Sequence, residues 1–278
     1  MGRRSAPGSQ WPGLTGASRH LKSVARESRI APWFGRKCRA LGKQGLQLNE
    51  QTLSMRLERV AAHVPAGARL ADIGSDHGYL PVALMRRGAI SIAIAGEVAS
   101  TPYRSAVRTV RESGLEGRIS VRLANGLAAI EAQDAITAIT VCGMGGETIR
   151  DILEAGKARL SGQERLVLQP NGGERPLRQW LMQQGYRIVA EEVLRENRFD
   201  YEIIVAERSG PVFYSPRELY FGPLQLQTRS AAFLHKWRRM LGQKQQTLAN
   251  FTQARQAVPE EKVRDIARQA RWIIELLA

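Results

Sequence analysis

From Leu46 to about Phe221 the chain alternates short β-branched or apolar runs with longer helical patterns. Parallel strands need a long return connection, so this alternation predicts an α/β fold in which helices cover both faces of a parallel sheet. Strands are predicted at residues 69–73, 91–96, 119–123, 138–142 and 165–169. Helices are predicted at residues 80–87, 102–113, 146–160 and 174–184. Two more strand patterns, 187–194 and 201–207, follow with no helix between them, so an antiparallel hairpin should end the sheet.

Two segments of different character flank this region. Residues 1–43 hold ten Lys and Arg against one acid, Glu27, with Gly, Ser and Pro scattered among them, so residues 1–45 are predicted to be a disordered extension. After Phe221-Gly222-Pro223, two helical patterns carry apolar residues at steps of three and four and are separated by a turn at Val258-Pro259. The predicted organisation is therefore an extension, a sheet domain over 46–222, and an antiparallel, coiled-coil-like hairpin over 223–278.

The charge of the chain points to a polyanionic partner. The formal net charge is +15, from 41 Lys and Arg against 26 Asp and Glu. Such a field concentrates nucleic acid, although solubility alone is an alternative reason for it. The excess is concentrated in the extension and the hairpin, and we expect the hairpin to hold RNA rather than only to cap the domain or form a dimer. Its basic residues are Arg229, Lys236, Arg238, Arg239, Lys244, Arg255, Lys262, Arg264, Arg268 and Arg271.

Several classes of protein are excluded by what the sequence lacks. No stretch approaches the ~18 consecutive apolar residues of a membrane-spanning helix, so no membrane contact is expected. The two cysteines, Cys38 and Cys142, lie far apart, which leaves no basis for a disulfide framework or a zinc site. A cytoplasmic protein without a metal is expected, as a monomer ahead of an oligomer.

The first informative motif is L-A-D-I-G-S-D-H-G-Y-L-P, residues 70–81, where a predicted strand passes into a predicted helix. Gly74 allows a sharp turn and close approach of a ligand to the backbone. A dinucleotide site would place further glycines here, but this chain has Asp76, which repels phosphate. Asp72 and Asp76 suit a cationic ligand such as S-adenosylmethionine. A structural turn with a capping aspartate is the alternative.

The next two strand ends carry an acid and an amide. Glu97 in A-G-E-V can accept both hydroxyls of a ribose, and Val98 beside it belongs to the same expected cofactor site. Asn125 in L-A-N-G-L can bind an adenine edge while Gly126 leaves room for the ring. The alternatives are a solvated loop acid and an ordinary Asn-Gly turn.

The fourth and fifth strand ends are rich in glycine and amide groups. In C-G-M-G-G the glycines, among them Gly143 and Gly145, should free backbone amides beside the methyl donor, and Met144 can form a polarisable wall for a base. The following helix points its positive end there. In Q-P-N, Asn171 can hold a base by its polar edge. The antiparallel ending of the sheet is likewise typical of Rossmann-like methyltransferases rather than dinucleotide dehydrogenases.

Taken in order, these motifs resemble the tRNA (adenine-N1)-methyltransferases that act at position 22, the TrmK type. The resemblance runs from about Leu53 to the C-terminus through the motifs above and through Y-E-I-I-V and E-L-Y-F-G-P. It implies a Rossmann-like domain with a helical hairpin, S-adenosylmethionine as donor, and tRNA as substrate. It places Asp72, Gly74, Asp76, Glu97, Asn125 and Gly126 at the cofactor, and residues 143–146, His77, Tyr79 and Asn171 around the target base. The extension departs from the family pattern.

The methyl transfer implied by this resemblance does not depend on general acid–base catalysis. Adenine N1 has an in-plane lone pair, so positioning should dominate once the base is unpaired. Tyr79 is expected to stack on the base, Asn171 to bind it, and Asp76 or His77 to polarise its amine. His77 could instead be a structural neighbour of a helix N-terminus. The competing interpretations are a non-catalytic RNA-binding protein on the same scaffold and a small-molecule methyltransferase.

Overall fold

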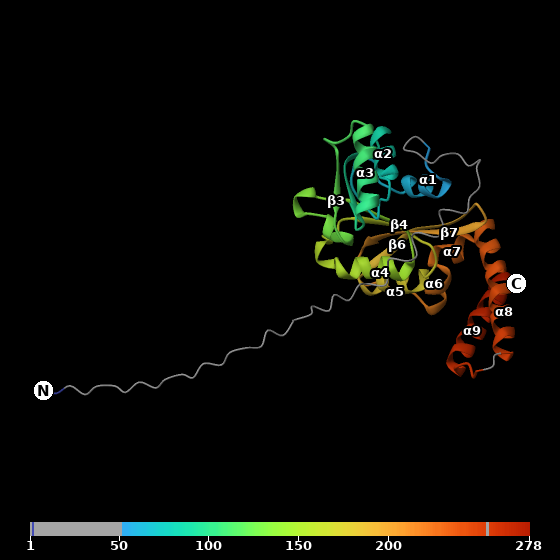
Figure 1. Cartoon of the computed structure of the whole chain (residues 1–278). Helices are drawn as coiled ribbons and strands as arrows, with labels where there is room; N and C mark the ends of the chain where they lie inside the picture. Colours follow the sequence, from blue (N-terminus) through green and yellow to red (C-terminus); the bar gives the residue numbers. More distant parts are fainter. Residues whose placement is uncertain (1, 3–51, 254–255) are drawn as a thin grey trace, which may run out of the picture. The chain divides into compact units, whose positions relative to one another are not determined.

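The computed structural model describes residue 2, residues 52–253 and residues 256–278 (Figure 1). Apart from Gly2, the predicted extension over 1–45 lies outside the described residues. The strands are β1 (Ala68–Ile73), β2 (Ile90–Glu97), β3 (Ile119–Leu123), β4 (Ala138–Met144), β5 (Arg165–Pro170), β6 (Tyr186–Glu196) and β7 (Phe199–Arg208). The α-helices are α1 (Met55–Ala62), α2 (Tyr79–Arg86), α3 (Ser100–Glu112), α4 (Gly146–Ala155), α5 (Glu174–Gln183), α6 (Pro216–Phe221), α7 (Pro223–Thr228), α8 (Ala231–Thr252) and α9 (Glu260–Leu277).

Within the described residues the strands form one sheet in the order β3-β2-β1-β4-β5-β7-β6. Strands β1 to β5 are parallel, and β7 is antiparallel to both β5 and β6. The predicted α/β fold and its antiparallel ending are therefore confirmed. The register matters for the site, because Asp72 of β1 lies opposite Thr140 of β4.

Two apolar cores lie on the two faces of the sheet. Helices α1, α2 and α3 cover one face, and α4 and α5 cover the other (Figure 1). Successive side chains along each strand point to opposite faces, so Leu70 joins the first core and Ala71 the second. Because the parallel strands are buried on both faces, they are continuous apolar runs in the sequence, and such runs are what locate the strands.

The predicted helices differ from the structure in two ways: one ends earlier than predicted, and three short helices were not predicted. The helix predicted over 146–160 ends at Ala155, and a 3₁₀ turn, Lys157–Arg159, follows. Gly156 at this break lies against η1, another 3₁₀ turn (Gly126–Ala129), and a Cβ there would be 2.4 Å from Cβ of Leu127. Helices α1, α6 and α7 were not predicted: each spans eight residues or fewer, and none lies between two predicted strands, where the alternation requires a helix. No helix in the described part of the chain has the length and apolar character needed to cross a membrane.

The C-terminal hairpin is present as α8 and α9. Phe233 and Trp237 of α8 pack with Ile273 and Leu276 of α9, and the same cluster contains Phe221 of α6 and Val193 of β6. The base of the hairpin thus shares a core with the sheet. The domain boundary at 222/223 stays a prediction.

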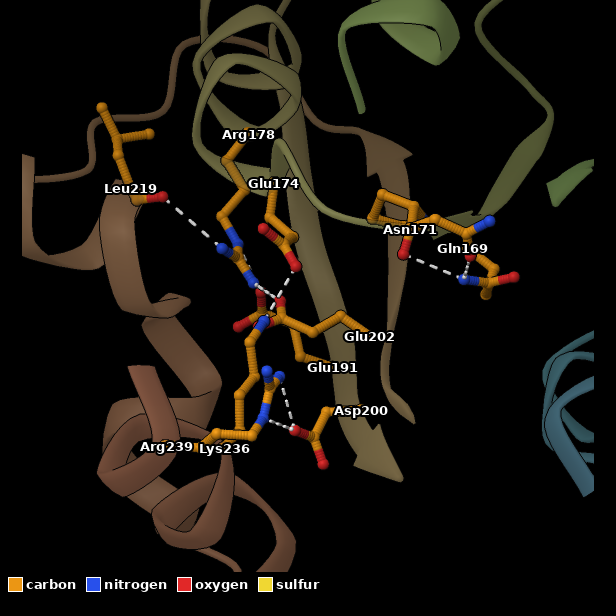
Figure 2. A network of polar contacts seen from close by, with 11 residues as sticks. Gln169, Asn171, Glu174, Arg178, Glu191, Asp200, Glu202, Leu219, Lys236 and Arg239 are labelled. Carbon is orange, nitrogen blue, oxygen red and sulfur yellow. Dashed lines mark hydrogen bonds and ion pairs between the residues drawn. The ribbon is translucent and has the colours of Figure 1, made fainter. Parts of the chain in front are cut away.

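Charged side chains from α5, β6, β7 and α8 meet in a group that we call the ion cluster, of which Glu174 is partly exposed and the others are buried: Arg178, Lys236, Glu174, Glu191 and Glu202 (Figure 2). Arg178 of α5 pairs with Glu191 at 2.7 Å and with Glu202. Lys236 of α8 pairs with Glu174 at 2.8 Å and with Glu202 at 2.5 Å. The prediction that Lys236 is part of an RNA-holding surface is therefore wrong, because its ammonium group is buried against carboxylates and leaves no exposed charge for phosphate.

The ion cluster contains more carboxylates than cations, and the pKa of one of its carboxyls is raised. Burial raises the pKa of Glu191, and repulsion by Glu202 adds to the effect, although Arg178 opposes it. Glu191 also accepts from the amides of Leu224 and Gln225, at 2.9 and 3.3 Å, at the start of α7. The cluster therefore joins α5, β6, β7, α7 and α8 through buried polar contacts.

Candidate active site

Asp72 lies near the end of β1, opposite Thr140 of β4, between the two strands at which the strand order reverses. It is 4 % exposed, and its carboxylate accepts from Ser75 Oγ and from Thr140 Oγ1, each at 2.6 Å. Burial raises the pKa of Asp72, and the two hydroxyl donors partly oppose the shift. Open sheets bind ligands at such a point, where the strand order reverses. Thr140 was missed from the sequence, although a hydroxyl within an apolar strand was a usable signal.

Glu97, at the end of β2, lies beside the turn that carries Asp76. Its carboxylate accepts from the amide of Asp76, a residue with a left-handed φ of 56°. Burial raises the pKa of Glu97, and repulsion from Asp76 and Asp72 adds to the shift. The structure therefore brings the three acids together, and burial disfavours the ionised forms of Asp72 and Glu97.

Gly74 and Met144 connect the ends of β1 and β4. Gly74 has a φ of +73°, and a Cβ on it would lie 2.1 Å from Cε of Met144. The amides of Gly74 and Ser75 both donate to the carbonyl of Gly96, at 2.9 and 3.2 Å. The turn after β1 is thus fixed against β2 on one side and β4 on the other.

The glycine-rich loop after β4 differs from the prediction. The amide of Gly143 donates to Gln169 Oε1 at 3.0 Å, and the amide of Gly146 donates to the carbonyl of Gly172 at 2.7 Å. The expectation of freed amides is therefore wrong for both residues. Gly146 is required for packing, because a Cβ there would lie 2.1 Å from the carbonyl oxygen of Gly173. The glycines allow this loop and the 169–173 loop to meet backbone to backbone.

Asn171, which directly follows β5, is held in place by this contact. Its side-chain amide nitrogen donates to the carbonyl of Gly143 at 2.7 Å, and its Oδ1 accepts from Gln169 Nε2 at 3.0 Å (Figure 2). Gln169 Oε1 in turn accepts from Arg56 Nη1 of α1 at 2.5 Å. Arg56 was missed from the sequence, because it lies far along the chain from Gln169 and its own segment has no motif.

Most of the remaining predicted residues directly follow the ends of β1, β2 and β3. The rings of His77 and Tyr79 are stacked, 5.1 Å apart and 9° from parallel. Val98 is 67 % exposed beside Glu97, and Asn125 is exposed at the end of β3. The backbone of Gly126 lies close to α4, because a Cβ added at this residue would be 3.0 Å from Cγ2 of Ile152. Close packing thus accounts for this glycine.

The strand order, with an antiparallel β7 inserted before β6, and an acidic crevice in place of a phosphate-binding turn define a Rossmann-like methyltransferase fold. The family model described as TrmK, tRNA (adenine(22)-N(1))-methyltransferase, matches residues 70–271. The chain belongs to this tRNA (adenine(22)-N(1))-methyltransferase family.

Individual relatives agree with this assignment. The tRNA (adenine(22)-N(1))-methyltransferase of Bacillus subtilis (strain 168) is 41% identical over 235 residues, which cover 83% of this chain and 97% of the relative. A putative tRNA (m1A22) methyltransferase of Streptococcus pneumoniae, solved in complex with S-adenosyl-L-methionine, is 43% identical with a TM-score of 0.75 and covers 82% of this chain and 100% of its own. The M. capricolum TrmK, solved with S-adenosyl-homocysteine, is 25% identical with a TM-score of 0.72 and covers 81% of this chain and 97% of its own.

Proposed function

We propose that this chain transfers a methyl group from S-adenosylmethionine to N1 of adenine 22 in tRNA. The observation that carries the proposal is the crevice formed by Asp72, Asp76 and Glu97, whose acids attract a cation and repel a phosphate. Membership of the family gives the target atom and position.

The donor is proposed to lie along the ends of β1, β2 and β3. Asp72 and Asp76 would face its cationic groups directly or through water, and Glu97 would accept both ribose hydroxyls. Val98 and Asn125 would contact the adenine of the donor, one through its apolar surface and the other through its amide. Gly74, Gly126, Gly143, Met144 and Gly145 complete the proposed cofactor site. When bound, the sulfonium supplies an electrophilic methyl group.

The target base is proposed to enter beside the 169–173 loop. N1 lies on the Watson–Crick edge, so the adenine must leave any pair or stack before it can react. Tyr79, already stacked on His77, would extend that stack to the base, and Asn171 would bind its polar edge. N1 attacks with its own lone pair, so no general base is required for the transfer. Asp76 or His77 would act on the exocyclic amine.

Methylation of tRNA by the purified chain tests the proposal. With S-adenosylmethionine and unmodified tRNA, one methyl group per tRNA is expected at adenine 22, located by mass spectrometry of nuclease fragments. A tRNA with guanine at that position is the control and should stay unmethylated. Cofactor-independent tRNA binding without transfer would instead support a non-catalytic RNA-binding protein. Methyl transfer to a small molecule but not to tRNA would support a small-molecule methyltransferase.

The affinity for S-adenosylmethionine is expected to fall as the pH is lowered from about 7 towards 5. Asp72 and Glu97 have raised pKa values, so they become protonated in the free protein at a higher pH than ordinary carboxyls. Each must release its proton before Asp72 can face a cationic group and Glu97 can accept from both ribose hydroxyls. Calorimetry in two buffers of different ionisation enthalpy measures both the affinity and the released protons. Glu97→Gln should reduce the proton release, and equal affinities with no release across this range would contradict the prediction.

The exposed basic side chains of the hairpin are proposed to hold the tRNA. Replacing Arg238, Arg264 and Arg271 together with glutamate should raise the KM for tRNA by about tenfold or more. The affinity should also depend less steeply on salt concentration, because fewer phosphate contacts release fewer counterions. The matched control replaces the same residues with lysine, which keeps the charge. An unchanged KM in the glutamate variant would remove the hairpin surface from the proposal. Deleting the hairpin is a poorer test, since Lys236 and Phe233 belong to the buried structure.

A further inference from the structure

Arg56 reaches from α1 to the ends of β4 and β5. Besides its contact with Gln169, its guanidinium carbon lies 5.5 Å from the centroid of the Tyr201 ring, and a Cβ on Gly143 would be 3.8 Å from its Nη1. Its side chain is half-buried, and it lies near enough to Asp72 to favour the ionised carboxylate. A cation is therefore fixed beside the loop that carries Asn171.

This cation determines the direction of a chain of hydrogen bonds. A guanidinium only donates, and so does the backbone amide of Gly143, so the group of Gln169 that faces both must be its oxygen. The amide nitrogen of Gln169 then faces two acceptors, the carbonyl of Pro170 at 2.9 Å and Oδ1 of Asn171. Asn171 is left with its nitrogen on the carbonyl of Gly143. Exchanging the ends of either amide would set donor against donor, or acceptor against acceptor.

We propose that Arg56 and Gln169 are positioning residues that keep Oδ1 of Asn171 oriented to accept from the exocyclic amine of the target adenine. The inference rests on the proposed function and deepens it. Oδ1 has a second lone pair beyond the one used by Gln169, and accepting from the amine leaves N1 unoccupied. In the transfer, N1 forms a bond to the methyl carbon, the carbon–sulfur bond breaks with its electron pair left on sulfur, and adenine becomes cationic. An acceptor on the amine stabilises that developing charge.

A hydrogen-bond donor at the position of Oδ1 of Asn171 would slow the transfer. If the amide of Asn171 were reversed, an N–H would face the base and could occupy the lone pair of N1, the pair that must attack. Gln169→Glu produces this reversal with little change of shape. The carboxylate still accepts from Arg56 and Gly143, but it cannot donate to Asn171, so the nitrogen of Asn171 should turn towards it.

The first measurement is the rate of transfer by the full chain with saturating tRNA and S-adenosylmethionine. Gln169→Glu and Arg56→Met should each lower kcat by about 10- to 100-fold, and for Gln169→Glu the Kd of S-adenosylmethionine should change by less than about threefold. Arg56→Lys keeps a cation that only donates and should recover most of the rate. Gln163→Glu and Arg118→Met, exposed at the opposite ends of β5 and β3, are matched controls and should behave as wild type.

The second measurement separates positioning from a merely structural role. It uses tRNA with purine, which lacks the exocyclic amine, in place of the target adenine. Removing the amine should lower kcat/KM of the wild type. The same change of substrate should lower kcat/KM of Gln169→Glu by less than about twofold, because in this variant the amine has already lost its acceptor. Equal losses in both proteins, or wild-type rates in Gln169→Glu and Arg56→Met, would overturn the inference alone. Absence of transfer by the wild type would overturn the proposed function with it.

Discussion

Replacing Glu97 with alanine is expected to weaken S-adenosylmethionine binding by about 100-fold, or about 2.7 kcal/mol. The carboxylate of Glu97 would accept from both ribose hydroxyls, and the expected loss is that of one hydrogen bond to a charged group, about 1.5–3 kcal/mol. It also accepts from the amide of Asp76, so its loss leaves the turn after β1 without one of its contacts. Calorimetry with the purified variant measures the affinity directly, and kcat/KM for tRNA methylation should fall in parallel.

Two further variants make this result specific. Glu97→Gln keeps the shape but only one acceptor, so its affinity should lie between those of wild type and Glu97→Ala. Glu116→Ala removes an exposed acid before β3, away from the crevice, and should bind as wild type does. A Glu97→Ala protein that is folded and binds the cofactor within about threefold of wild type would exclude the ribose role.

Replacing Arg178 with methionine is expected to lower the free energy of unfolding by about 3–5 kcal/mol. Arg178 is fully buried and pairs with both Glu191 and Glu202, so the substitution leaves buried carboxylates with fewer cations. The loss should be smaller near pH 5 than near pH 8. Burial already raises the pKa of Glu191, and loss of the guanidinium raises this pKa further, so stability that depends on the protonated form of Glu191 is lost as the pH rises. Chemical denaturation at both pH values measures the effect.

The matched control for this prediction is Arg217→Met. Arg217 of α6 pairs with Glu275 of α9 at 2.8 Å, but both side chains are exposed, so its removal should change stability by less than about 1 kcal/mol. The double variant Arg178→Met/Glu191→Gln removes one uncompensated charge while keeping an acceptor for the amides of α7, and it should recover part of the loss. A single Arg178→Met variant as stable as wild type would show that pairing with Arg178 is not needed to keep Glu191 and Glu202 buried.

Much of the fold could be predicted because buried parallel strands have continuous apolar sequences. The end of each strand is then known to within a residue or two, and this brings Asp72 and Glu97 to one edge of the sheet before any coordinates are known. The motifs after β1, β2, β3 and β4 were found for the same reason. The hairpin of α8 and α9 was predicted from its apolar periodicity.

The partners of individual polar groups could not be predicted in this way. Lys236 belongs to a basic segment, and its burial against Glu174 and Glu202 depends on how α8 lies over the sheet. The amides of Gly143 and Gly146 are used by the 169–173 loop because two glycine-rich turns meet. Helix α1 lies before the first strand, where the alternation of strands and helices does not require a helix, so Arg56 could not be placed beside Gln169.

The sequence by itself determined the sheet, its antiparallel ending, and the acids and glycines at the strand ends, because residue type and spacing act locally and strand periodicity carries them to one edge. Only the tertiary structure decided which donor faces which acceptor. The Arg56–Gln169 contact joins residues 113 positions apart, and the Lys236–Glu202 pair joins residues 34 apart. Hydrogen bonds and buried ion pairs depend on distance and direction in space, which no local pattern of residues encodes.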